Sequence, residues 1–382
     1  MRASVPAAVP PVAEAALAPP HAAVCKDAAM GKGAKAKAGK TAKDKSGTKG
    51  KSSKGNSTRR APGKPGAPSP AEVTPDGRLT GKAAAKAEKK RAKAAKARKD
   101  EAVEPVTWSD ALRVGEGFVL ADLDPRSTPG FSGRKADGAE VMGELQARLG
   151  DLQERLFAES KGGGQRSVLL VIQGMDTSGK GGIMRHVVGA VDPQGVHITS
   201  FKAPSAEEKR HRFLWRIRNA LPRPGMIGVF DRSHYEDVLI VRVHDLVPRA
   251  TWSRRYAQIN AFEKGVVDDG TVVVKVMMHI SGAEQKARLA QRLEREDKHW
   301  KFNPSDIDER GRWADYMQAY QSALEKCSTQ AAPWFVVPAD RKWYARLAVT
   351  NLLLEHLEAM DPKWPAADFD VEEQKARLAL TP

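Results

Sequence analysis

The sequence predicts an α/β fold for residues 105–382: a three-layer α/β/α sandwich around a parallel five-stranded sheet. Short β-branched runs alternate here with longer helical stretches, which is the pattern of successive βαβ units. The runs are continuously apolar more than alternating, as expected of strands that helices cover on both faces. One of them leads directly into a glycine-rich turn. We expect the strands at 167–173, 196–201, 226–230, 272–280 and 334–337.

Residues 1–104 differ in composition from the rest and form a basic tail. They hold 24 Lys and Arg against 9 Asp and Glu, which is +15 of the chain's formal charge of +16. Residues 31–70 carry almost no large apolar side chains, so burial cannot offset the entropy of ordering them, and we expect the tail to be disordered. It either keeps the protein in solution or binds polyphosphate or nucleic acid, because lysine runs release counterions from phosphate chains.

Cysteine content and hydropathy indicate the compartment. The two cysteines, Cys25 and Cys327, are too few for a disulfide framework, so a reducing, cytoplasmic location fits best. No run approaches the roughly 18 apolar residues that span a bilayer. Prolines interrupt the Ala-rich start at Pro6, Pro10 and Pro11. We therefore expect no membrane segment.

Two stretches with the pattern of a capping box follow predicted strands, at 205–208 (SAEE) and 281–284 (SGAE). In such a box a serine and a glutamate three residues later satisfy free N–H groups at the start of a helix. We expect a helix directly after each of these strands.

A phosphate-binding loop follows the first predicted strand. The run 167–173 (SVLLVIQ) enters Gly174-x-x-x-x-Gly179-Lys180, and a helix-compatible stretch follows at 181–191. Glycines allow successive backbone N–H groups to turn toward phosphate oxygens, and Lys180 adds a full positive charge. A tight strand-to-helix connection is the structural alternative, but the flanking strand and helix favour phosphate binding.

The residue after the lysine departs from the common form of this loop. Gly181 stands where a Ser or Thr usually holds magnesium, so a metal needs another ligand. Asp176 lies within the loop, and phosphate would repel its carboxylate unless a cation lay between them. We expect Mg²⁺, with Mn²⁺ as a substitute, to bind there. Capping of the turn is the alternative role of Asp176.

A second carboxylate, Asp231, follows the run 226–230 and precedes Arg232. Open α/β sheets bind ligands at the carboxyl ends of their strands, so Asp231 should face the phosphate-binding loop. Asp176 and Asp231 then form a pair of metal ligands, and Arg232 reaches the phosphates. The alternative is a structural ion pair between Asp231 and Arg232, which contributes only ~0–1 kcal/mol at a surface.

Two basic clusters should surround the same crevice. One follows the second strand. The other lies at about 285–312, where Arg288, Arg292 and Arg295 have the spacing of one helix face. A hinged helical lid there would bring arginines over the reacting phosphate and exclude water. The same stretch carries acidic residues, so a solvated, salt-bridged face is the alternative.

Six segments of the chain together closely resemble the family-2 polyphosphate kinases. They are 174–182 (GMDTSGKGG), 199–204 (TSFKAP), 213–222 (FLWRIRNALP), 230–244 (FDRSHYEDVLIVRVH), 299–316 (HWKFNPSDIDERGRWADY) and 332–346 (APWFVVPADRKWYAR). The resemblance covers roughly residues 105–365. It implies a P-loop kinase fold with a helical lid, and Mg²⁺-dependent phosphoryl transfer between inorganic polyphosphate and a nucleotide.

The resemblance also implies roles for individual residues. It places the family's loop aspartate and lysine at Asp176 and Lys180, and its second acidic motif at Asp231 and Arg232. The lid arginine that we select is Arg292.

Two further details bear on substrate choice. The stretch 234–238 (HYEDV), which contains Glu236, resembles the subgroup that accepts both nucleoside mono- and diphosphates. The lid departs from the family pattern, because the chain has Arg295-Glu296-Asp297 where Asp-Pro is expected before Lys298. This departure bears on lid geometry and chain-length preference.

The complete candidate site joins these side chains to the backbone of the loop and to nearby cations. The catalytic candidates are Asp176, Lys180, Asp231, Arg232 and Arg292. Phosphate or nucleotide binding is expected from Gly174, Met175, Thr177, Ser178, Gly179, Gly181, Lys202, Arg212, Arg216, Glu236, Arg288, Lys298 and Lys301. The expected substrates are polyphosphate and purine nucleotides (AMP, ADP, GMP and GDP), and the expected assembly is a homodimer or homotetramer.

Two other functions share some of these features. An ATP-dependent small-molecule kinase has the same loop and lid but needs a pocket for a carbon skeleton, whereas the residues here are polar and basic. A nucleic-acid-binding protein would use the tail 1–104 and keep the loop as an accessory nucleotide site.

Overall fold

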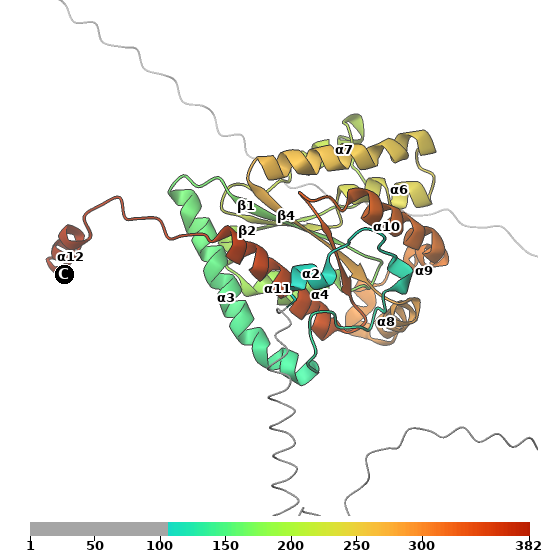
Figure 1. Ribbon diagram of the computed structural model, residues 1–382, viewed down its shortest axis with the longest axis horizontal. Coiled ribbons are helices and arrows are strands. Elements are labelled where there is room, and N and C mark those ends of the chain that lie inside the picture. Colours follow the sequence, from blue (N-terminus) through green and yellow to red (C-terminus); the bar gives the residue numbers. More distant parts are fainter. Residues whose placement is uncertain (1–105) are drawn as a thin grey trace, which may run out of the picture. The chain divides into compact units, whose positions relative to one another are not determined.

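The computed structural model describes residues 106–382 (Figure 1). The basic tail predicted at 1–104 lies outside the described residues, and so do its predicted disorder, its binding of polyphosphate or nucleic acid, and Cys25. The described residues correspond to the domain predicted at 105–382.

Five parallel strands form one sheet in the order β2-β3-β1-β4-β5. They are β1 (Ser167–Gln173), β2 (Val196–Ser200), β3 (Ile227–Asp231), β4 (Thr271–His279) and β5 (Trp334–Pro338). All five predicted strands are confirmed, and each end lies within one residue of its predicted place. Their β-branched and aromatic side chains favour strands because they pack well on a pleated surface.

Helices and short 3₁₀ turns connect the strands. The longer helices are α3 (Lys135–Lys161), α7 (Arg249–Asp268), α8 (Gly282–Glu294), α10 (Trp313–Cys327) and α11 (Lys342–Met360). The shorter ones are α2 (Trp108–Leu112), α4 (Lys180–His186), α5 (Trp215–Arg218), α6 (Ile240–Val243), α9 (Ser305–Gly311) and α12 (Val371–Ala379). The 3₁₀ turns are η2 (Leu120–Asp122), η3 (Val188–Ala190), η4 (Pro193–Gly195), η5 (Glu208–Arg210), η6 (His234–Asp237) and η7 (Glu296–Lys301). Within residues 106–382, each helix is too short or too polar to traverse a bilayer.

Helices cover both faces of the sheet, which confirms the three-layer sandwich (Figure 1). On one face, α7 and α10 pack against a cluster that includes Val171 and Phe230. On the other face, α3, α4 and α11 pack against a cluster that includes Leu170 and Ile172. Alternate residues of β1 thus enter two separate cores, which is why its whole run is apolar.

The edge strand β2 does not show the predicted burial on both faces. Ile198 in β2 is 49% exposed, whereas Ile172 in β1 is fully buried. Because β2 pairs only with β3, it lies at the margin of the sheet, where the covering helices do not reach. The prediction of a strand at 196–201 is thus confirmed, but the prediction that helices cover both of its faces is wrong.

The two predicted capping boxes have different outcomes. At Ser205 both bonds form, since its N–H donates to Glu208 Oε2 at 2.7 Å and its Oγ accepts from Glu208 N at 3.2 Å. The element that comes next is only the three-residue turn η5, so the helix expected there is wrong. Ser281 does cap a long helix, α8, but its N–H donates to Asp340 and not to Glu284.

The strand register brings the expected site residues together. Asp231, the last residue of β3, pairs with Ile172 near the end of β1 and with Ser200 at the end of β2. The segments after all three strands therefore leave the sheet at the same edge, as open parallel sheets require of a ligand site.

Candidate active site

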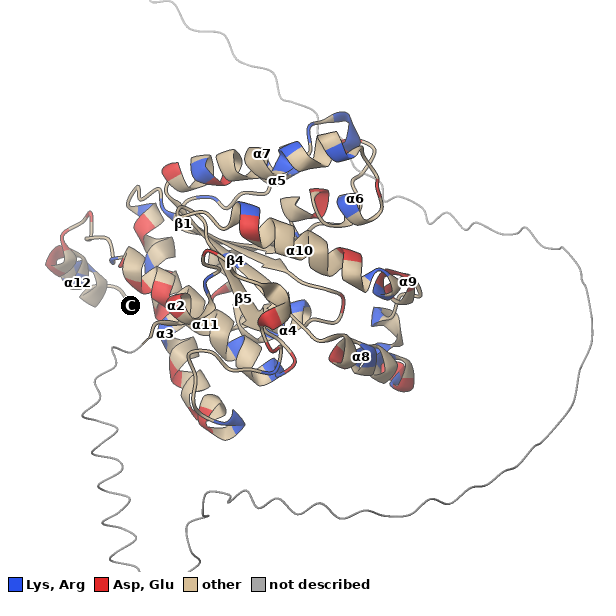
Figure 2. Ribbon diagram, turned by 45° about the vertical axis from the view of Figure 1, so that its right-hand side comes forward, with Lys and Arg blue, Asp and Glu red and all other residues tan. Residues whose placement is uncertain are grey.

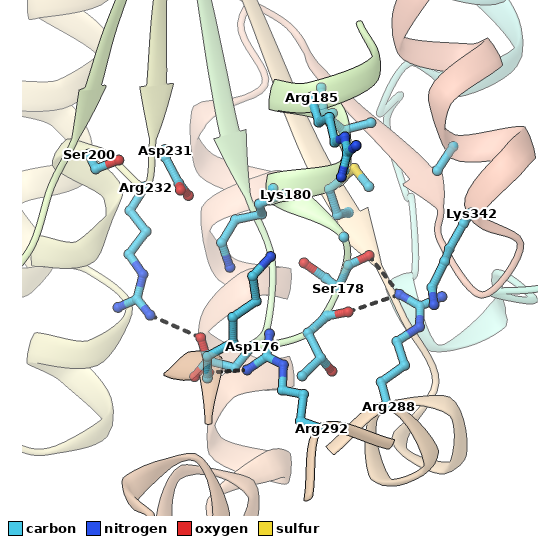
Figure 3. A pocket seen from close by; sticks show the side chains of 18 of the residues that line it. Asp176, Ser178, Lys180, Arg185, Ser200, Asp231, Arg232, Arg288, Arg292 and Lys342 are labelled. Carbon is cyan, nitrogen blue, oxygen red and sulfur yellow. Dashed lines mark hydrogen bonds and ion pairs between the residues drawn. The ribbon is translucent and has the colours of Figure 1, made fainter. Parts of the chain in front are cut away.

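A cavity of about 720 Å³ opens at the carboxyl ends of β1, β2 and β3 (Figure 3). Its walls come from the loop after β1, the start of α4, the residues just after β2 and β3, α8 with η7, and the start of α11. The predicted site residues that line it are Asp176, Thr177, Ser178, Gly179, Lys180, Gly181, Lys202, Asp231, Arg232, Arg288, Arg292, Lys298 and Lys301. Segments far apart in the sequence therefore meet around one space.

The loop after β1 needs glycine at two positions. Gly174 has a φ of +151°, and a Cβ there would lie 2.7 Å from Ser178 Oγ and 2.8 Å from the Met278 carbonyl oxygen. Gly179 has a φ of +117°, which L side chains rarely adopt. Helix α4 then begins at Lys180, but it ends at His186, so the helix predicted at 181–191 is shorter than expected and continues as the turn η3.

Lys180 folds back over this loop. Its Nζ donates to the carbonyl oxygens of Gly174 at 2.7 Å and Met175 at 3.3 Å. Burial lowers the pKa of Lys180, and the nearby carboxylate of Asp176 works against that lowering. An anion entering the cavity would favour the charged ammonium further, which is the electrostatic condition for a phosphate site.

Arg232 connects the loop after β3 to the loop after β1. Its guanidinium donates to Asp176 Oδ1 at 3.0 Å and lies 3.8 Å from Glu236 Oε2 (Figure 3). Burial opposes the charge of Arg232, but the carboxylates of Glu236 and Asp176 outweigh it and raise the pKa of the guanidinium. Among the described ion pairs, Arg232 therefore joins Asp176 across the cavity and not its neighbour Asp231.

Arg288 braces the phosphate-binding loop from below. It is 6% exposed, and its NH1 donates to the carbonyl oxygens of Thr177 at 2.9 Å and Ser178 at 3.0 Å. Its NH2 donates to the carbonyl oxygens of Ala339 and Asp340, and its Nε donates to a glutamate one turn earlier. A guanidinium has five N–H donors, and all five are used. The expectation that Arg288 binds phosphate directly is thus corrected to support of the loop.

Arg292 lies one turn further along α8 and keeps donors for a ligand. Its NH1 donates to the Lys301 carbonyl oxygen at 2.9 Å and to Asp306 Oδ2 at 3.2 Å, while its other nitrogens make no hydrogen bond within residues 106–382. Arg295 does not share this face, because α8 ends at Glu294. Arg295 instead pairs with the exposed Asp297, whose pKa its hydrogen bonds lower.

Three further cations line the cavity and were not predicted: Arg185 on α4, and Lys342 and Arg346 on α11. Among residues 106–382, none of the three forms an ion pair with a carboxylate. Burial lowers the pKa of Arg346, and the positive charge of Arg185 lowers it further. Lys342 and Arg346 lie in the segment 332–346, which resembles the family-2 polyphosphate kinases. That resemblance could therefore have identified both residues from the sequence.

Two predicted binding residues lie away from the cavity. Arg212 is exposed and is not part of the wall. Arg216 is 9% exposed, donates to the Lys202 carbonyl oxygen at 2.8 Å, and lies over the Phe201 ring at 5.4 Å. The guanidinium of Arg216 therefore points into the protein, where it supports the backbone at Lys202.

Three more predicted residues line a smaller hollow of about 30 Å³ on the other side of the Asp176–Arg232 pair: Gly174, Met175 and Glu236. Burial raises the pKa of Glu236, and Arg232 counteracts this. Glu236 therefore does not line the main cavity, but its carboxylate lies near Arg232, which does.

The donor set of the cavity suits a hard divalent cation. Asp176 and Asp231 both line it and offer carboxylate oxygens. Residues 106–382 contain no group of three or more His, Cys, Asp and Glu side chains gathered as metal ligands. Mg²⁺ is typically held by one or two carboxylates together with waters and substrate phosphates, so two carboxylates beside a phosphate-binding loop fit it.

Comparison with known proteins identifies relatives across most of the folded part. Residues 133–365 match the family model described as polyphosphate kinase 2 (PPK2). An AMP/ADP-polyphosphate phosphotransferase from Meiothermus ruber is 43% identical over 248 residues, which cover 65% of this chain and 91% of the relative. An ADP-polyphosphate phosphotransferase from Rhodopseudomonas palustris is 41% identical over 268 residues, covering 66% and 91%. The crystal structure of polyphosphate kinase 2 from Arthrobacter aurescens TC1 matches with a TM-score of 0.71 and 55% identity, over 73% of this chain and 99% of that one.

Proposed function

The chain belongs to the polyphosphate kinase 2 family, and from this we infer that it is a phosphotransferase that moves phosphoryl groups between inorganic polyphosphate and nucleotides. One observation carries the inference within the chain itself. Asp176, Lys180, Asp231 and Arg232 line one cavity together with three cations that no carboxylate of residues 106–382 neutralises. A polyanion supplies the charge that such a cavity lacks.

We propose that AMP, ADP, GMP and GDP are acceptors and that the transfer is reversible. The relatives are named for AMP and ADP, which supports adenine nucleotides directly. The stretch 234–238 supports mono- and diphosphate acceptors alike. Transfer between phosphoanhydrides is nearly isoenergetic, so concentrations set its direction.

Asp176 and Asp231 would hold Mg²⁺, with Mn²⁺ as a substitute. When bound, the cation neutralises charge on the phosphate oxygens that react. The carboxylates are suited to this because both line the cavity, Asp231 from the last position of β3 and Asp176 from the loop that follows the neighbouring strand β1. No other side chain in the described wall offers a carboxylate.

The side chains of the cavity position the reacting groups and stabilise their charge. A phosphate oxygen of the acceptor attacks the terminal phosphorus of polyphosphate in line with the bond that breaks. Because this oxygen is already ionised at neutral pH, the reaction depends more on orientation and charge stabilisation than on a general base. Lys180, Arg232 and Arg292 supply that positive charge, and η7 with Lys298 and Lys301 contributes to a lid that excludes water.

The unpaired cations Arg185, Lys342 and Arg346 extend the positive surface from the phosphate-binding loop to α11. We assign them to the part of polyphosphate that does not react. A long donor would then be held at several phosphates, and its affinity would depend strongly on salt.

The experiment that tests this function is incubation with polyphosphate, Mg²⁺ and each of the four nucleotides in turn, followed by separation of the products. New di- or triphosphates are expected, and no product should form without polyphosphate. Absence of product with all four acceptors would contradict the proposed function.

The same assay on residues 105–382 separates the enzyme from the two rivals. Full polyphosphate-dependent activity without the tail 1–104 argues against a nucleic-acid-binding protein with an accessory loop. A requirement for ATP in place of polyphosphate would favour a small-molecule kinase. Sedimentation of the full chain tests the proposed homodimer or homotetramer, and fractionation of cells tests the proposed cytoplasmic location.

A further inference from the structure

A fully buried ionic group lies behind the active site, in the core under α7 and α10. It consists of Lys275 on β4, Glu263 on α7, and His234 and Tyr235 on η6. Each of these residues is at most 1% exposed. The proposed chemistry uses none of them.

Every donor of the ammonium is satisfied. Lys275 Nζ donates to Glu263 Oε2 at 2.6 Å, to Tyr235 Oη at 2.8 Å and to the Cys327 carbonyl oxygen at 2.7 Å. An ammonium has three N–H donors, and here all three are used. The lysine therefore joins β4, α7, η6 and the end of α10 at one point.

The carboxylate collects the other donors of η6. Glu263 Oε1 accepts from the Tyr235 hydroxyl at 2.9 Å and from His234 Nε2 at 3.1 Å. His234 Nδ1 has no partner within residues 106–382, so the ring proton is on Nε2. Although burial acts in the opposite direction, Lys275 and His234 hold the pKa of Glu263 below its usual value. Glu263 is thus an ionised carboxylate that fixes two consecutive side chains of η6.

A buried ion pair of this kind is a poor means of stabilising a fold, because apolar residues of similar volume do as well or better. Its geometric effect is larger, because a satisfied buried network admits one arrangement of its members. The segment that it holds, 233–235, directly follows Arg232.

Arg232 has a φ of +64°, a left-handed conformation that is unfavourable for a residue with a Cβ. From this conformation its guanidinium reaches Asp176 at 3.0 Å. Asp231, on one side of it, is held in the ladder of β3. On its other side Ser233 is fully buried, and its Oγ accepts from the Tyr235 N–H at 3.2 Å. The backbone of Arg232 is therefore constrained from both ends.

Gln173 connects the same segment to the phosphate-binding loop. It is the last residue of β1 and precedes Gly174. With its amide turned so that both ends find a partner, its nitrogen donates to Glu236 Oε1 at 3.1 Å, and its oxygen accepts from Ser233 N at 3.1 Å. The two loops that carry Asp176 and Arg232 are thus joined beneath the cavity as well as across it.

We propose that Lys275, Glu263 and Tyr235 are positioning residues that hold Arg232 in its left-handed conformation, facing Asp176. They act by fixing the segment 233–235, and they do not contact substrate. This inference rests on the proposed function, because the consequence for turnover requires that Arg232 serves phosphoryl transfer.

The variant Tyr235→Phe tests the proposal with a minimal change, since it removes the hydroxyl between Lys275 and Glu263 and keeps the ring. Misplacement of Arg232 should lower kcat by about tenfold to 100-fold, with a smaller change in KM. Tyr256→Phe is the matched control. Tyr256 is also a tyrosine of this core, 4% exposed, and its hydroxyl accepts from Arg242 at 3.3 Å, away from 232–235. Its kcat should stay within about twofold of the unchanged protein.

The decisive comparison is made in the background of Arg232→Ala. If the hydroxyl acts through Arg232, adding Tyr235→Phe to Arg232→Ala should lower kcat no further. Losses that multiply would assign Tyr235 a merely structural role and overturn the proposal. The combined variant Glu263→Gln with Lys275→Met makes the same test without altering Tyr235, should Tyr235→Phe fail to fold.

A measurement that does not depend on activity separates this inference from the proposed function. The Cα chemical shift of Arg232 reports its backbone conformation. It should have the left-handed value in the unchanged protein and in Tyr256→Phe, and should move toward the average value in Tyr235→Phe. An unchanged shift in Tyr235→Phe overturns the inference whether or not the protein transfers phosphate. Absence of phosphoryl transfer in the unchanged protein would instead contradict the proposed function.

Discussion

Two walls of the active-site cavity carry arginines that differ in their partners. On α8, Arg288 donates all five of its N–H groups to protein atoms, and Arg292 has an acidic partner in Asp306. Figure 2 shows acidic and basic residues intermixed along α8 and α9. On α4 and α11, Arg185 and Arg346 line the same cavity without a carboxylate partner in the described part of the chain.

The difference teaches how to separate structural cations from those that bind substrate. A guanidinium whose donors are satisfied holds the protein together, and its removal leaves buried acceptors unpaired. A guanidinium without partners contributes little to folding, and near other cations it is repelled until an anion arrives. Substitution of the first kind should lower the free energy of unfolding, and substitution of the second kind should weaken the binding of a polyanion.

The largest effect is expected where the two walls meet, at the carboxylates. Asp176→Asn and Asp231→Asn should each lower kcat by about 1,000-fold or more, because each removes a ligand for the divalent cation that offsets developing charge. Circular dichroism and thermal unfolding should stay close to the unchanged protein. Asp268→Asn is the matched control, since Asp268 is exposed at the end of α7. Near-normal turnover in either variant would show that the residue is not a ligand of the divalent cation.

A second, smaller effect should separate the bracing arginine from the others. Arg288→Met should reduce the free energy of unfolding by about 3 kcal/mol, because four backbone carbonyl oxygens lose their donor. Activity should fall together with stability, since the loop at Ser178 loses its support. Urea unfolding and kcat measured on the same preparation check this. Unchanged stability in Arg288→Met would contradict the view that the hydrogen-bonded arginine of α8 stabilises the fold.

The opposite pattern is expected of Arg346→Ala. Stability should be unchanged or slightly higher, because a cation repelled by Arg185 is removed. The KM for long polyphosphate should rise by about tenfold, and the slope of log KM against log salt should decrease by about one. Kinetics at several sodium chloride concentrations test both. A fall in kcat at constant KM would place Arg346 at the reacting centre and contradict the assignment to the distal part of the donor.

The smallest effect is expected of Arg212→Ala. Its place in the basic cluster after the second strand had predicted that Arg212 binds phosphate, yet it is exposed and outside the cavity. Both kcat and KM should remain within about twofold of the unchanged protein. Arg216→Ala, by contrast, should destabilise the backbone at Lys202. A raised KM for polyphosphate in Arg212→Ala would restore the residue to the binding surface.

Local patterns predicted more of this protein than side-chain spacing did. All five strands were predicted within one residue, since each is a short stretch rich in β-branched or aromatic residues. Asp176, Lys180, Asp231 and Arg232 were placed together correctly, because parallel strands end at one edge of a sheet. Helical spacing alone misplaced Arg295, since α8 ends at Glu294 before that residue.

The sequence by itself determined the sheet, the glycine-rich loop and the two carboxylates, because each depends on residues adjacent along the chain or on the order of strands. Only the tertiary structure decided which cations are engaged. Arg288 is satisfied by carbonyl oxygens at Ala339 and Asp340, about fifty positions away, and Arg232 is held by a core network that starts at Lys275 on another strand. The partners of a long charged side chain are set by packing between distant elements, so its role is decided by the fold and not by its neighbours in sequence.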